Sequence, residues 1–308
     1  MRPRVAVTLG DPRGIGSEIV RKVLQSPPEG VDYVVIGPGE LVSGMPAEQI
    51  VVGEPAVGSG ASRDTLTLSA ADAGRLTALQ VEEAVALALS GSVQAVVTGP
   101  AEKRALHLAG YEYPGHTEWL GELSGGVETA MMLTAGGLRV VLITTHLPLR
   151  DVVCAVTLDR VVRVGHLAVR ALKEWWGIAE PRIALCALNP HAGESGLFGS
   201  EELKVLAPAA RELCITGPLP ADTVFVRALR GEFHAVLTPY HDVGMTAVKI
   251  VGFGKGVNVT LGLPFVRTAP DHGTAFDIAG QGVADPGSMR EAVALAARLA
   301  QNSVAGKG

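Results

Sequence analysis

The sequence predicts an α/β fold with mostly parallel strands, and three observations carry that prediction. Short runs rich in Val, Ile and Leu alternate along the 308-residue chain with longer stretches of helical apolar spacing. These runs lack a regular polar and apolar alternation, so both faces of each strand are expected to be buried, as in a parallel sheet. Glycine is frequent, at 38 residues, which suits the tight turns between strands and helices that such a fold requires.

Local composition justifies each element of this alternation. Apolar residues at helical spacing predict a long amphipathic helix over residues 70–90, and an Ala- and Leu-rich stretch predicts a closing helix over 289–301. Runs of Val and Ile bounded by Gly, Pro or Asn predict the strands. In chain order, strands are expected at 5–9, 33–37 and 94–100 and in the later runs 139–146, 182–191 and 234–241, with further helices from Ser17 and around Lys103.

Composition and charge exclude several classes of protein. A net charge of −5 without a basic block argues against nucleic acid as the main partner. The apolar runs fall short of the roughly 18 to 20 residues that a membrane span needs, and residues 1–7 show no signal-peptide core. Cys154, Cys186 and Cys214 are odd in number and lack a pairing motif, which indicates reduced thiols. We therefore expect a cytoplasmic protein that is long enough for two domains.

Three of the predicted strands each end in a histidine. These residues are His146, His191 and His241, at the ends of the runs 139–146, 182–191 and 234–241. Ligands of open α/β sheets bind beyond the carboxyl ends of the strands, so the three imidazoles are expected at one edge. Imidazole suits zinc and related divalent ions, which predicts a metal site and an enzyme. The alternative for each histidine alone is that it caps its own strand and bonds to the backbone.

Three further motifs carry polar groups. The turn 10–16 is rich in glycine, but its spacing departs from the Gly-x-Gly-x-x-Gly dinucleotide fingerprint. His116, Thr117 and Glu118 follow a glycine turn and could bind a polar substrate, although Thr117 could equally be a helix N-cap. Residues 189–196 pack an amide, an imidazole and a carboxylate between a strand and a helix. Such a concentration of polar groups favours a ligand site, because it is costly without one.

Six blocks of sequence carry a resemblance to a known family. They are Pro-Gly-His-Thr-Glu at 114–118, Thr-Thr-His-Leu-Pro-Leu at 144–149, Asn-Pro-His-Ala-Gly-Glu at 189–194, Gly-Pro-Leu-Pro-Ala-Asp-Thr at 217–223, Tyr-His-Asp at 240–242 and Leu-Gly-Leu-Pro-Phe-Val-Arg at 261–267. Together they resemble the 4-hydroxythreonine-4-phosphate dehydrogenase family of vitamin B6 synthesis. The segment 271–285 also resembles the adenosine-binding loop of isocitrate and isopropylmalate dehydrogenases, whose fold this family shares.

The resemblance implies an isocitrate/isopropylmalate dehydrogenase-like fold of two α/β domains with mostly parallel sheets and an interdomain cleft. The first domain is expected to comprise residues 1–118 and 270–308 with the adenosine-binding loop. The second is expected to comprise 119–269 with the metal histidines and a dimer interface. The implied assembly is a homodimer whose active site is shared between subunits, with no membrane or nucleic-acid partner.

The same resemblance assigns roles to individual residues. His146, His191 and His241 would bind the divalent metal, with zinc as the first choice and magnesium, manganese or cobalt as alternatives. An acceptor at Asp277 would bind a ribose hydroxyl and disfavour a 2′-phosphate, so NAD is expected instead of NADP. The implied substrate contacts are His116, Thr117, Lys249, Asn258 and Arg267, and the implied cofactor contacts are His272, Gly273, Thr274, Asp277 and Asp285.

The implied reaction is NAD- and metal-dependent oxidation of 4-phosphooxy-threonine, or 4-hydroxythreonine 4-phosphate, at the 3-hydroxyl. Decarboxylation to 3-amino-2-oxopropyl phosphate would follow. Asp222 and Lys249 are both candidates for the general base. Two rival interpretations are a three-histidine metal hydrolase without a nucleotide and a non-catalytic sugar-phosphate sensor, although a sensor would not be expected to keep all three histidines.

Some positions depart from the family pattern. Val243 stands where the family usually has glutamine, and Arg13 stands where alanine is typical. Residues 268–270 read Thr-Ala-Pro in place of the more common Thr-Ser-Val. These departures keep open an alternative substrate within the same family, namely 4-phosphothreonate or 4-phosphoerythronate.

Overall fold

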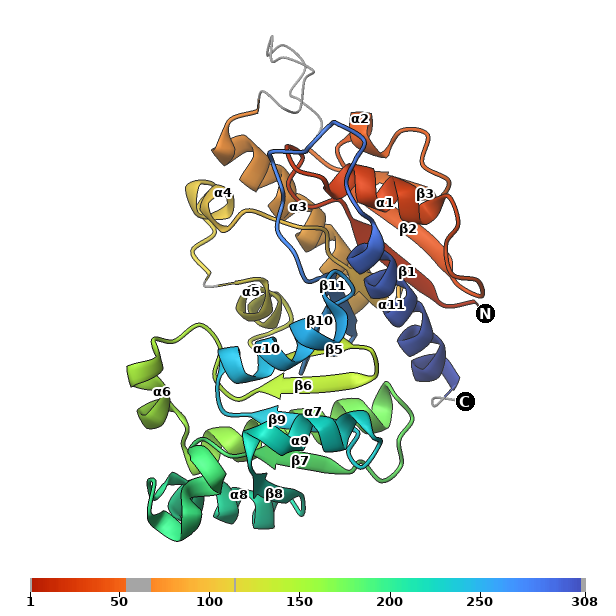
Figure 1. Cartoon of the computed structure of the whole chain (residues 1–308). Coiled ribbons are helices and arrows are strands. Elements are labelled where there is room, and N and C mark those ends of the chain that lie inside the picture. Colours follow the sequence, from red (N-terminus) through yellow and green to blue (C-terminus); the bar gives the residue numbers. More distant parts are fainter. Residues whose placement is uncertain (1, 54–67, 114, 306–308) are drawn as a thin grey trace. The chain divides into compact units, whose positions relative to one another are not determined.

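The computed structural model describes residues 2–53, 68–113 and 115–305 (Figure 1). The chain divides into two compact units, unit 1 with Met1–Glu128 and Leu263–Gly308, and unit 2 with Thr129–Gly262. The divisions therefore fall after residues 128 and 262, whereas the sequence placed them after 118 and 269.

Packing explains where the first unit ends. Trp119 and Leu120, which lie beyond the expected boundary, are buried in the same apolar core as Leu263 and Phe265. Unit 1 therefore keeps the whole helix that contains Trp119 and the whole strand that follows Phe265.

Unit 1 is built on a parallel sheet with the strand order β3-β2-β1-β4-β11. The strands are β1 (Arg4–Thr8), β2 (Asp32–Gly37), β3 (Glu48–Val51), β4 (Ala95–Val97) and β11 (Val266–Pro270). The helices are α1 (Gly16–Leu24), α2 (Gly39–Val42), α3 (Ala70–Leu89), α4 (Lys103–Leu108), α5 (His116–Leu123) and α11 (Gly287–Ala305). Helix α3 contacts β1, β2 and β4, while α11 contacts β1, β4 and β11 (Figure 1).

The long helix α3 forms where the apolar spacing predicts it. Its N-terminus is capped by Ser69, whose hydroxyl accepts a hydrogen bond of 3.1 Å from the backbone N–H of Asp72. Its buried face includes Ala78, Val81 and Val85, which pack in the core of unit 1 with residues of the sheet. The predicted helix at 70–90 is therefore confirmed, and the expected closing helix is also present, as α11.

Unit 2 is built on a mixed sheet with the strand order β10-β5-β6-β9-β7-β8. Strand β5 is antiparallel to both of its neighbours, and the other pairings are parallel. The strands are β5 (Ala130–Ala135), β6 (Leu138–Leu142), β7 (Ile183–Cys186), β8 (Thr216–Leu219), β9 (Ala235–Thr238) and β10 (Val257–Leu261). The predicted α/β class with mostly parallel strands is confirmed.

Helical segments join the strands of unit 2. They are α6 (Leu149–Ala155), α7 (Leu158–Glu174), the 3₁₀ segment η2 (Pro190–Gly196), the π-helical turn η3 (Glu202–Leu206), α8 (Ala207–Glu212), α9 (Ala221–Leu229) and α10 (His241–Gly252). Helix α7 carries an N-cap at Thr157, whose hydroxyl accepts from Arg160 N. Among the helices described in either unit, none combines the length and the apolar character that crossing a membrane would require.

Candidate functional site

The three histidine-bearing runs form adjacent parallel strands in unit 2. Strand β9 lies between β6 and β7 and is parallel to both, so the carboxyl ends of all three strands lie at one edge of the sheet. Each strand is shorter than its predicted run. His146 lies four residues beyond β6, His191 five residues beyond β7, and His241 begins α10 three residues beyond β9. The histidines therefore lie in the segments that follow the strands, and His241 is the first residue of a helix.

Backbone pairing continues past the ends of β6 and β9 and brings two of the histidines together. The N–H of Ile143 donates to the carbonyl of Thr238 at 2.9 Å, and the buried hydroxyl of Thr144 donates to the carbonyl of Pro239 at 2.7 Å. The two segments thus lie side by side up to His146 and His241. The ring centroids of these histidines lie 5.6 Å apart.

A pocket of about 120 Å³ lies beside this pair of rings. It is lined by Thr145, His146, Leu147, Leu149, Val152, Tyr240, His241 and Asp242. The Nδ1 of His241 and Oδ1 of Asp242 share a hydrogen bond of 2.7 Å. A carboxylate on one ring nitrogen is the usual second partner of a metal-binding histidine, because it fixes the ring and leaves the other nitrogen available.

The third histidine takes a different path. His191 and the next four residues all have positive φ values between 42° and 76°, a left-handed stretch that non-glycine residues rarely adopt. The His191 ring lies 6.4 Å from the ring of Phe198. Within the ranges that the structure describes, no three His, Cys, Asp or Glu side chains are grouped to hold a metal ion. The structure thus brings together two of the three predicted ligands.

A buried carboxylate that the sequence did not single out holds the His191 segment. Glu202 is 2% exposed, and its Oε1 accepts from the N–H groups of Leu188 at 2.9 Å and Asn189 at 2.7 Å. Its Oε2 accepts from the Asn189 amide at 2.9 Å. A Cβ at Gly193 would lie 2.7 Å from Oε2, so this close approach favours glycine. The φ of 76° at this position favours glycine as well.

Removal of this carboxylate should destabilise unit 2 more than removal of its neighbour. Glu202→Ala leaves three donors without their acceptor, and a loss of about 2 to 4 kcal/mol is expected, since stranded buried donors each cost about 1 kcal/mol or more. Glu201→Ala is the matched control. Glu201 is less buried than Glu202, and it also accepts a hydrogen bond from the Asn189 amide, at 2.8 Å. Urea unfolding of both variants measures the difference. Equal losses would contradict the anchoring role of Glu202.

The predicted substrate residues of unit 1 include a buried positive charge. Arg267 lies in β11 and is 3% exposed, and its Nη2 donates to the Thr98 hydroxyl at 2.6 Å. Burial lowers the pKa of Arg267 to about 10, which leaves the guanidinium charged at neutral pH. A buried cation of this kind is suited to an anionic ligand.

His116 lies at the start of α5 in the field of this cation. Burial, with the positive charges of Arg267 and Lys103, lowers the pKa of His116 to about 3, so the imidazole is neutral at physiological pH. Its Nε2 is buried and has no hydrogen-bond partner among the described residues. Buried polar atoms are normally satisfied, so this nitrogen is available to a ligand. The ring borders a small pocket lined by Lys103, Leu106, Tyr111, Tyr113, Gly115 and Trp119.

The neighbouring Thr117 is buried but does not cap the helix. Gly115 occupies the N-cap position of α5, and Thr117 is the second helical residue. The N-cap interpretation of Thr117 is therefore wrong. Pro114, the first residue of this sequence block, lies outside the described residues.

Two of the remaining predicted residues of unit 2 lie on α10 and β10. Lys249 is in the last turn of α10, with its Nζ 5.7 Å from the centroid of the Phe253 ring. Asn258 is in β10, and its Oδ1 is buried without a hydrogen-bond partner in the described part of the chain. The candidate base Asp222 is exposed in the first turn of α9.

The predicted cofactor loop 271–285 is anchored to the segment around α1 of unit 1. The carbonyl of Thr274 accepts from Ile15 N at 3.0 Å. Further along, the Glu18 carboxylate accepts from Ala284 N at 2.8 Å, and Lys22 donates to the carbonyl of Ala284 at 2.7 Å. The backbone of the loop is therefore held near both of its ends.

The side chains of this loop differ in exposure and in their contacts. His272, Gly273 and Asp277 are exposed, and the Nδ1 of His272 lies 3.0 Å from the carbonyl oxygen of Gly273. Thr274 is half-buried. Asp285 is engaged at the start of α11, where its Oδ1 accepts from Gly287 N at 2.8 Å. A carboxylate in this position stabilises the helix N-terminus, a structural role that the sequence did not predict.

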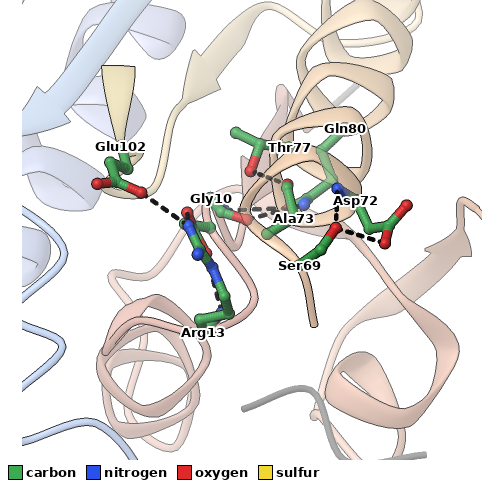
Figure 2. Close-up of polar contacts among 9 residues, drawn as sticks. Gly10, Arg13, Ser69, Asp72, Ala73, Thr77, Gln80 and Glu102 are labelled. Atoms are coloured by element: carbon green, nitrogen blue, oxygen red, sulfur yellow. Dashed lines mark hydrogen bonds and ion pairs between the residues drawn. The ribbon is translucent and has the colours of Figure 1, made fainter. Parts of the chain in front are cut away.

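The turn between β1 and α1 is shaped by another residue that the sequence did not identify. Gln80 on α3 is fully buried, and its Oε1 accepts from Leu9 N at 2.9 Å and Gly10 N at 3.1 Å. Its amide donates to the Gly10 carbonyl at 2.9 Å (Figure 2). Gly10 has a φ of 79°, and a Cβ there would lie 2.1 Å from the carbonyl oxygen of Pro100. This turn therefore requires glycine.

Comparisons with known proteins cover almost the whole chain. Residues 45–296 match the model of the family described as pyridoxal phosphate biosynthetic protein PdxA. A 4-hydroxythreonine-4-phosphate dehydrogenase of Beijerinckia indica subsp. indica is 42% identical over 324 residues, which cover 96% of this chain and 94% of that protein. A D-threonate 4-phosphate dehydrogenase of Salmonella typhimurium is also 42% identical, over 327 residues that cover 96% of this chain and 98% of that protein.

Solved structures agree with the sequence relatives. The crystal structure of 4-hydroxythreonine-4-phosphate dehydrogenase from Klebsiella pneumoniae has a TM-score of 0.85 and 39% identity, with coverage of 97% of this chain and 100% of that one. The resemblance carried by the six sequence blocks is confirmed, and the hydrolase interpretation is wrong because these relatives are dehydrogenases. The chain is an oxidoreductase that belongs to the pyridoxal phosphate biosynthetic protein PdxA family.

Proposed function

We propose that the protein oxidises the 3-hydroxyl of 4-phosphooxy-threonine with NAD and then decarboxylates the product to 3-amino-2-oxopropyl phosphate, in pyridoxal phosphate biosynthesis. The observation that carries this proposal is the buried Arg267 beside the neutral His116, whose Nε2 has no hydrogen-bond partner among the described side chains and backbone groups. A buried cation with an adjacent unsatisfied nitrogen is suited to an anionic substrate. The relatives named above act, by their names, on phosphorylated four-carbon acids.

The substrate contacts are proposed to be His116, Thr117, Lys249, Asn258 and Arg267. Arg267 and Lys249 supply the cations for the phosphate, because a doubly charged group needs more than one charge-assisted bond. His116 and Thr117 contribute a neutral nitrogen and a hydroxyl, and Asn258 contributes a buried amide oxygen. These groups would hold the substrate so that its 3-hydroxyl is oriented for oxidation.

A divalent cation, with zinc as the first choice, is assigned to His146, His191 and His241. The first and third fit this role, since two imidazoles flank one pocket and a carboxylate fixes the ring of His241. His191 fits only if the left-handed segment 191–195 adopts another path. When bound, such a cation polarises the oxygen of a secondary alcohol and favours loss of its proton.

The proton of the 3-hydroxyl must pass to a base on the protein. Asp222 and Lys249 remain the two candidates. Asp222 is an exposed carboxylate at the start of α9, while Lys249 is half-buried on α10. Lys249 is also assigned to the phosphate, so Asp222 is the candidate without a second assigned role.

The nicotinamide cofactor of this dehydrogenase is proposed to be NAD, bound at His272, Gly273, Thr274, Asp277 and Asp285. Asp277 presents an exposed carboxylate on a loop whose backbone is anchored near both ends. A carboxylate there accepts from a ribose hydroxyl and repels a 2′-phosphate. Asp285 contributes through the backbone, since its carboxylate already caps α11.

Loss of the Asp277 charge should weaken NAD binding specifically. Asp277→Asn is expected to raise the Kd for NAD by about 10- to 100-fold, because a hydrogen bond to a charged group contributes about 1.5 to 3 kcal/mol. Titration of the purified protein with NAD measures this constant, and the KM for substrate serves as the internal control. An unchanged NAD constant with altered substrate affinity would place the nucleotide elsewhere.

A homodimer with a shared active site is also proposed. Unit 2 exposes large apolar side chains on α6, after η2 and at the end of α10. They are Leu149, Val153, Leu197, Phe198, Ile250 and Phe253, and Phe253 is 84% exposed. Exposed apolar side chains mark an interface where they form one contiguous patch, and the proposed dimer would cover these side chains.

A second substrate has specific support, since relatives of 40% to 42% identity are named D-threonate 4-phosphate dehydrogenase. The two substrates differ at carbon 2, which bears an amino group in one and a hydroxyl in the other. Among the departures from the family pattern, Ala269 and Pro270 are buried in β11 of unit 1. Val243 lies beside the pocket residue Asp242 and is the departure that could reach the substrate.

Steady-state kinetics with both compounds test the choice of substrate. The proposed function predicts a higher kcat/KM for 4-phosphooxy-threonine than for D-threonate 4-phosphate. A preference for the threonate would retain the phosphate site but reject the vitamin B6 reaction for this protein.

A further inference from the structure

Arg13, in the turn between β1 and α1, joins three segments of unit 1. Its Nε and Nη2 donate to the two oxygens of Asp11 at 3.0 and 2.8 Å, and Nη2 also donates to Glu102 at 2.8 Å (Figure 2). Its guanidinium carbon lies 5.0 Å from the centroid of the Phe276 ring. The side chain thus connects the β1–α1 turn, the segment after β4 and the loop 271–285.

The charge of Arg13 is already balanced by these contacts. The side chain of Asp11 is fully buried, and that of Glu102 is 30% exposed. The hydrogen bond to Asp11 raises the pKa of the guanidinium, so it remains charged and paired. A guanidinium between two carboxylates does not attract a further anion, which favours a role in positioning over one in phosphate binding.

The fixed guanidinium of Arg13 stacks on the ring of Phe276, which lies in the middle of the loop. Phe276 is 42% exposed, so the loop lacks a buried apolar anchor at this point. The backbone anchors lie on either side, at Thr274 and at Ala284. The stack on Arg13 therefore ties the central part of the loop, next to Asp277, to the β1–α1 turn, whereas the hydrogen bond from the Gln281 amide to the Asp277 carbonyl at 2.8 Å lies within the loop itself.

We propose that Arg13 is a positioning residue for the cofactor, and that it acts by holding Phe276 and thereby the exposed carboxylate of Asp277. This inference rests on the proposed binding of NAD at the loop 271–285. A guanidinium stacked on an aromatic ring restrains the ring and does not itself need to bind the ligand. The loss of that restraint should weaken the cofactor while leaving the chemical step intact.

The experiment compares Arg13→Ala with Arg21→Ala in the full-length protein. Arg21 lies on α1, the helix that follows the turn, but its side chain donates to the carbonyls of Leu41 and Ser43, away from the loop. Two readouts are needed, namely hydrogen–deuterium exchange of peptides from 272–282 and the kinetic constants with NAD as the varied substrate. Arg13→Ala should accelerate exchange in these peptides and raise the KM for NAD by about three- to tenfold. This fold-change corresponds to the free energy of one partly desolvated cation–π contact. The kcat at saturating NAD should stay near that of the unaltered protein, and Arg21→Ala should change neither readout.

A double-mutant cycle with Phe276→Leu identifies the path of the effect. If Arg13 acts through the ring, the double variant should be no worse than either single variant, because the two changes remove one contact. Additive effects of the two changes would overturn the proposal. Exchange and KM values that match those of Arg21→Ala would also overturn it.

A third outcome separates this inference from the proposed function. Faster exchange with an unchanged KM for NAD in Arg13→Ala would overturn the role of Arg13 in cofactor binding. The Asp277→Asn variant then shows which of the two assignments is wrong. If that variant also binds NAD normally, the assignment of the cofactor to the loop is wrong, whereas weakened binding would retain the assignment and remove Arg13 alone from it.

Discussion

Replacement of Arg267 by lysine should lower kcat/KM for the phosphorylated substrate by about 100- to 1,000-fold, because impairing one partner of a buried charge pair costs about 3 to 4 kcal/mol. Lysine keeps the charge but loses the planar fork that binds two phosphate oxygens at once. The side chain is 3% exposed in β11, so solvent cannot compensate for the lost bonds. Steady-state kinetics measure the loss, and circular dichroism confirms that the variant is folded.

A comparison with unphosphorylated 4-hydroxythreonine controls this prediction. The unaltered protein should already turn over that compound poorly, and Arg267→Lys should cause little further loss, since the contact is absent in both cases. Distant binding energy also orients the reacting group, so the loss should appear in kcat as well as in KM. An equal loss on both compounds would show that Arg267 acts through the fold and not through the phosphate.

Alanine at any of His146, His191 and His241 should weaken zinc binding by about 100-fold or more, since the loss even of a residue that only orients a metal ligand costs 10- to 100-fold. His166→Ala is the control, because His166 is exposed on α7. Equilibrium dialysis followed by metal analysis measures the binding without reference to activity. Activity should fall in parallel while the fold is retained.

His191 is the decisive variant of the three. Its segment runs through five residues of positive φ, and its ring lies beside Phe198, 6.4 Å between centroids. The metal assignment requires this loop to move when the ion binds. Full metal content in His191→Ala, with loss in the other two variants, would limit the histidine ligands to His146 and His241.

The sequence predicted those features of the fold that follow from local pattern. Apolar runs bounded by turn residues identified β6, β7 and β9, and their parallel arrangement placed the segments after them at one edge. The resulting proximity of His146 and His241 followed from this topology. The exact ends of the strands did not follow from the sequence, because the predicted runs include the polar residues beyond each strand, where only a few backbone hydrogen bonds such as that from Ile143 to Thr238 continue the pairing.

The features that the sequence missed depend on tertiary contacts. Glu202 and Gln80 satisfy backbone groups 13 to 71 residues away, a role that leaves no mark on composition or periodicity. The left-handed path of residues 191–195 follows the backbone that Glu202 holds at Leu188 and Asn189, and it cannot be inferred from five residues of which only one is glycine. The boundary after residue 128 follows from the burial of Trp119 in the core of unit 1.

In the proposed reaction, oxidation of a phosphorylated hydroxy-amino acid is coupled to reduction of NAD and is followed by release of carbon dioxide. The most direct measurement follows NADH and carbon dioxide together, with purified protein, 4-phosphooxy-threonine, NAD and zinc. We predict equal amounts of both products, with NADP a poor substitute for NAD and with little turnover of unphosphorylated 4-hydroxythreonine. Formation of NADH without carbon dioxide, or comparable turnover of the unphosphorylated compound, would contradict this account.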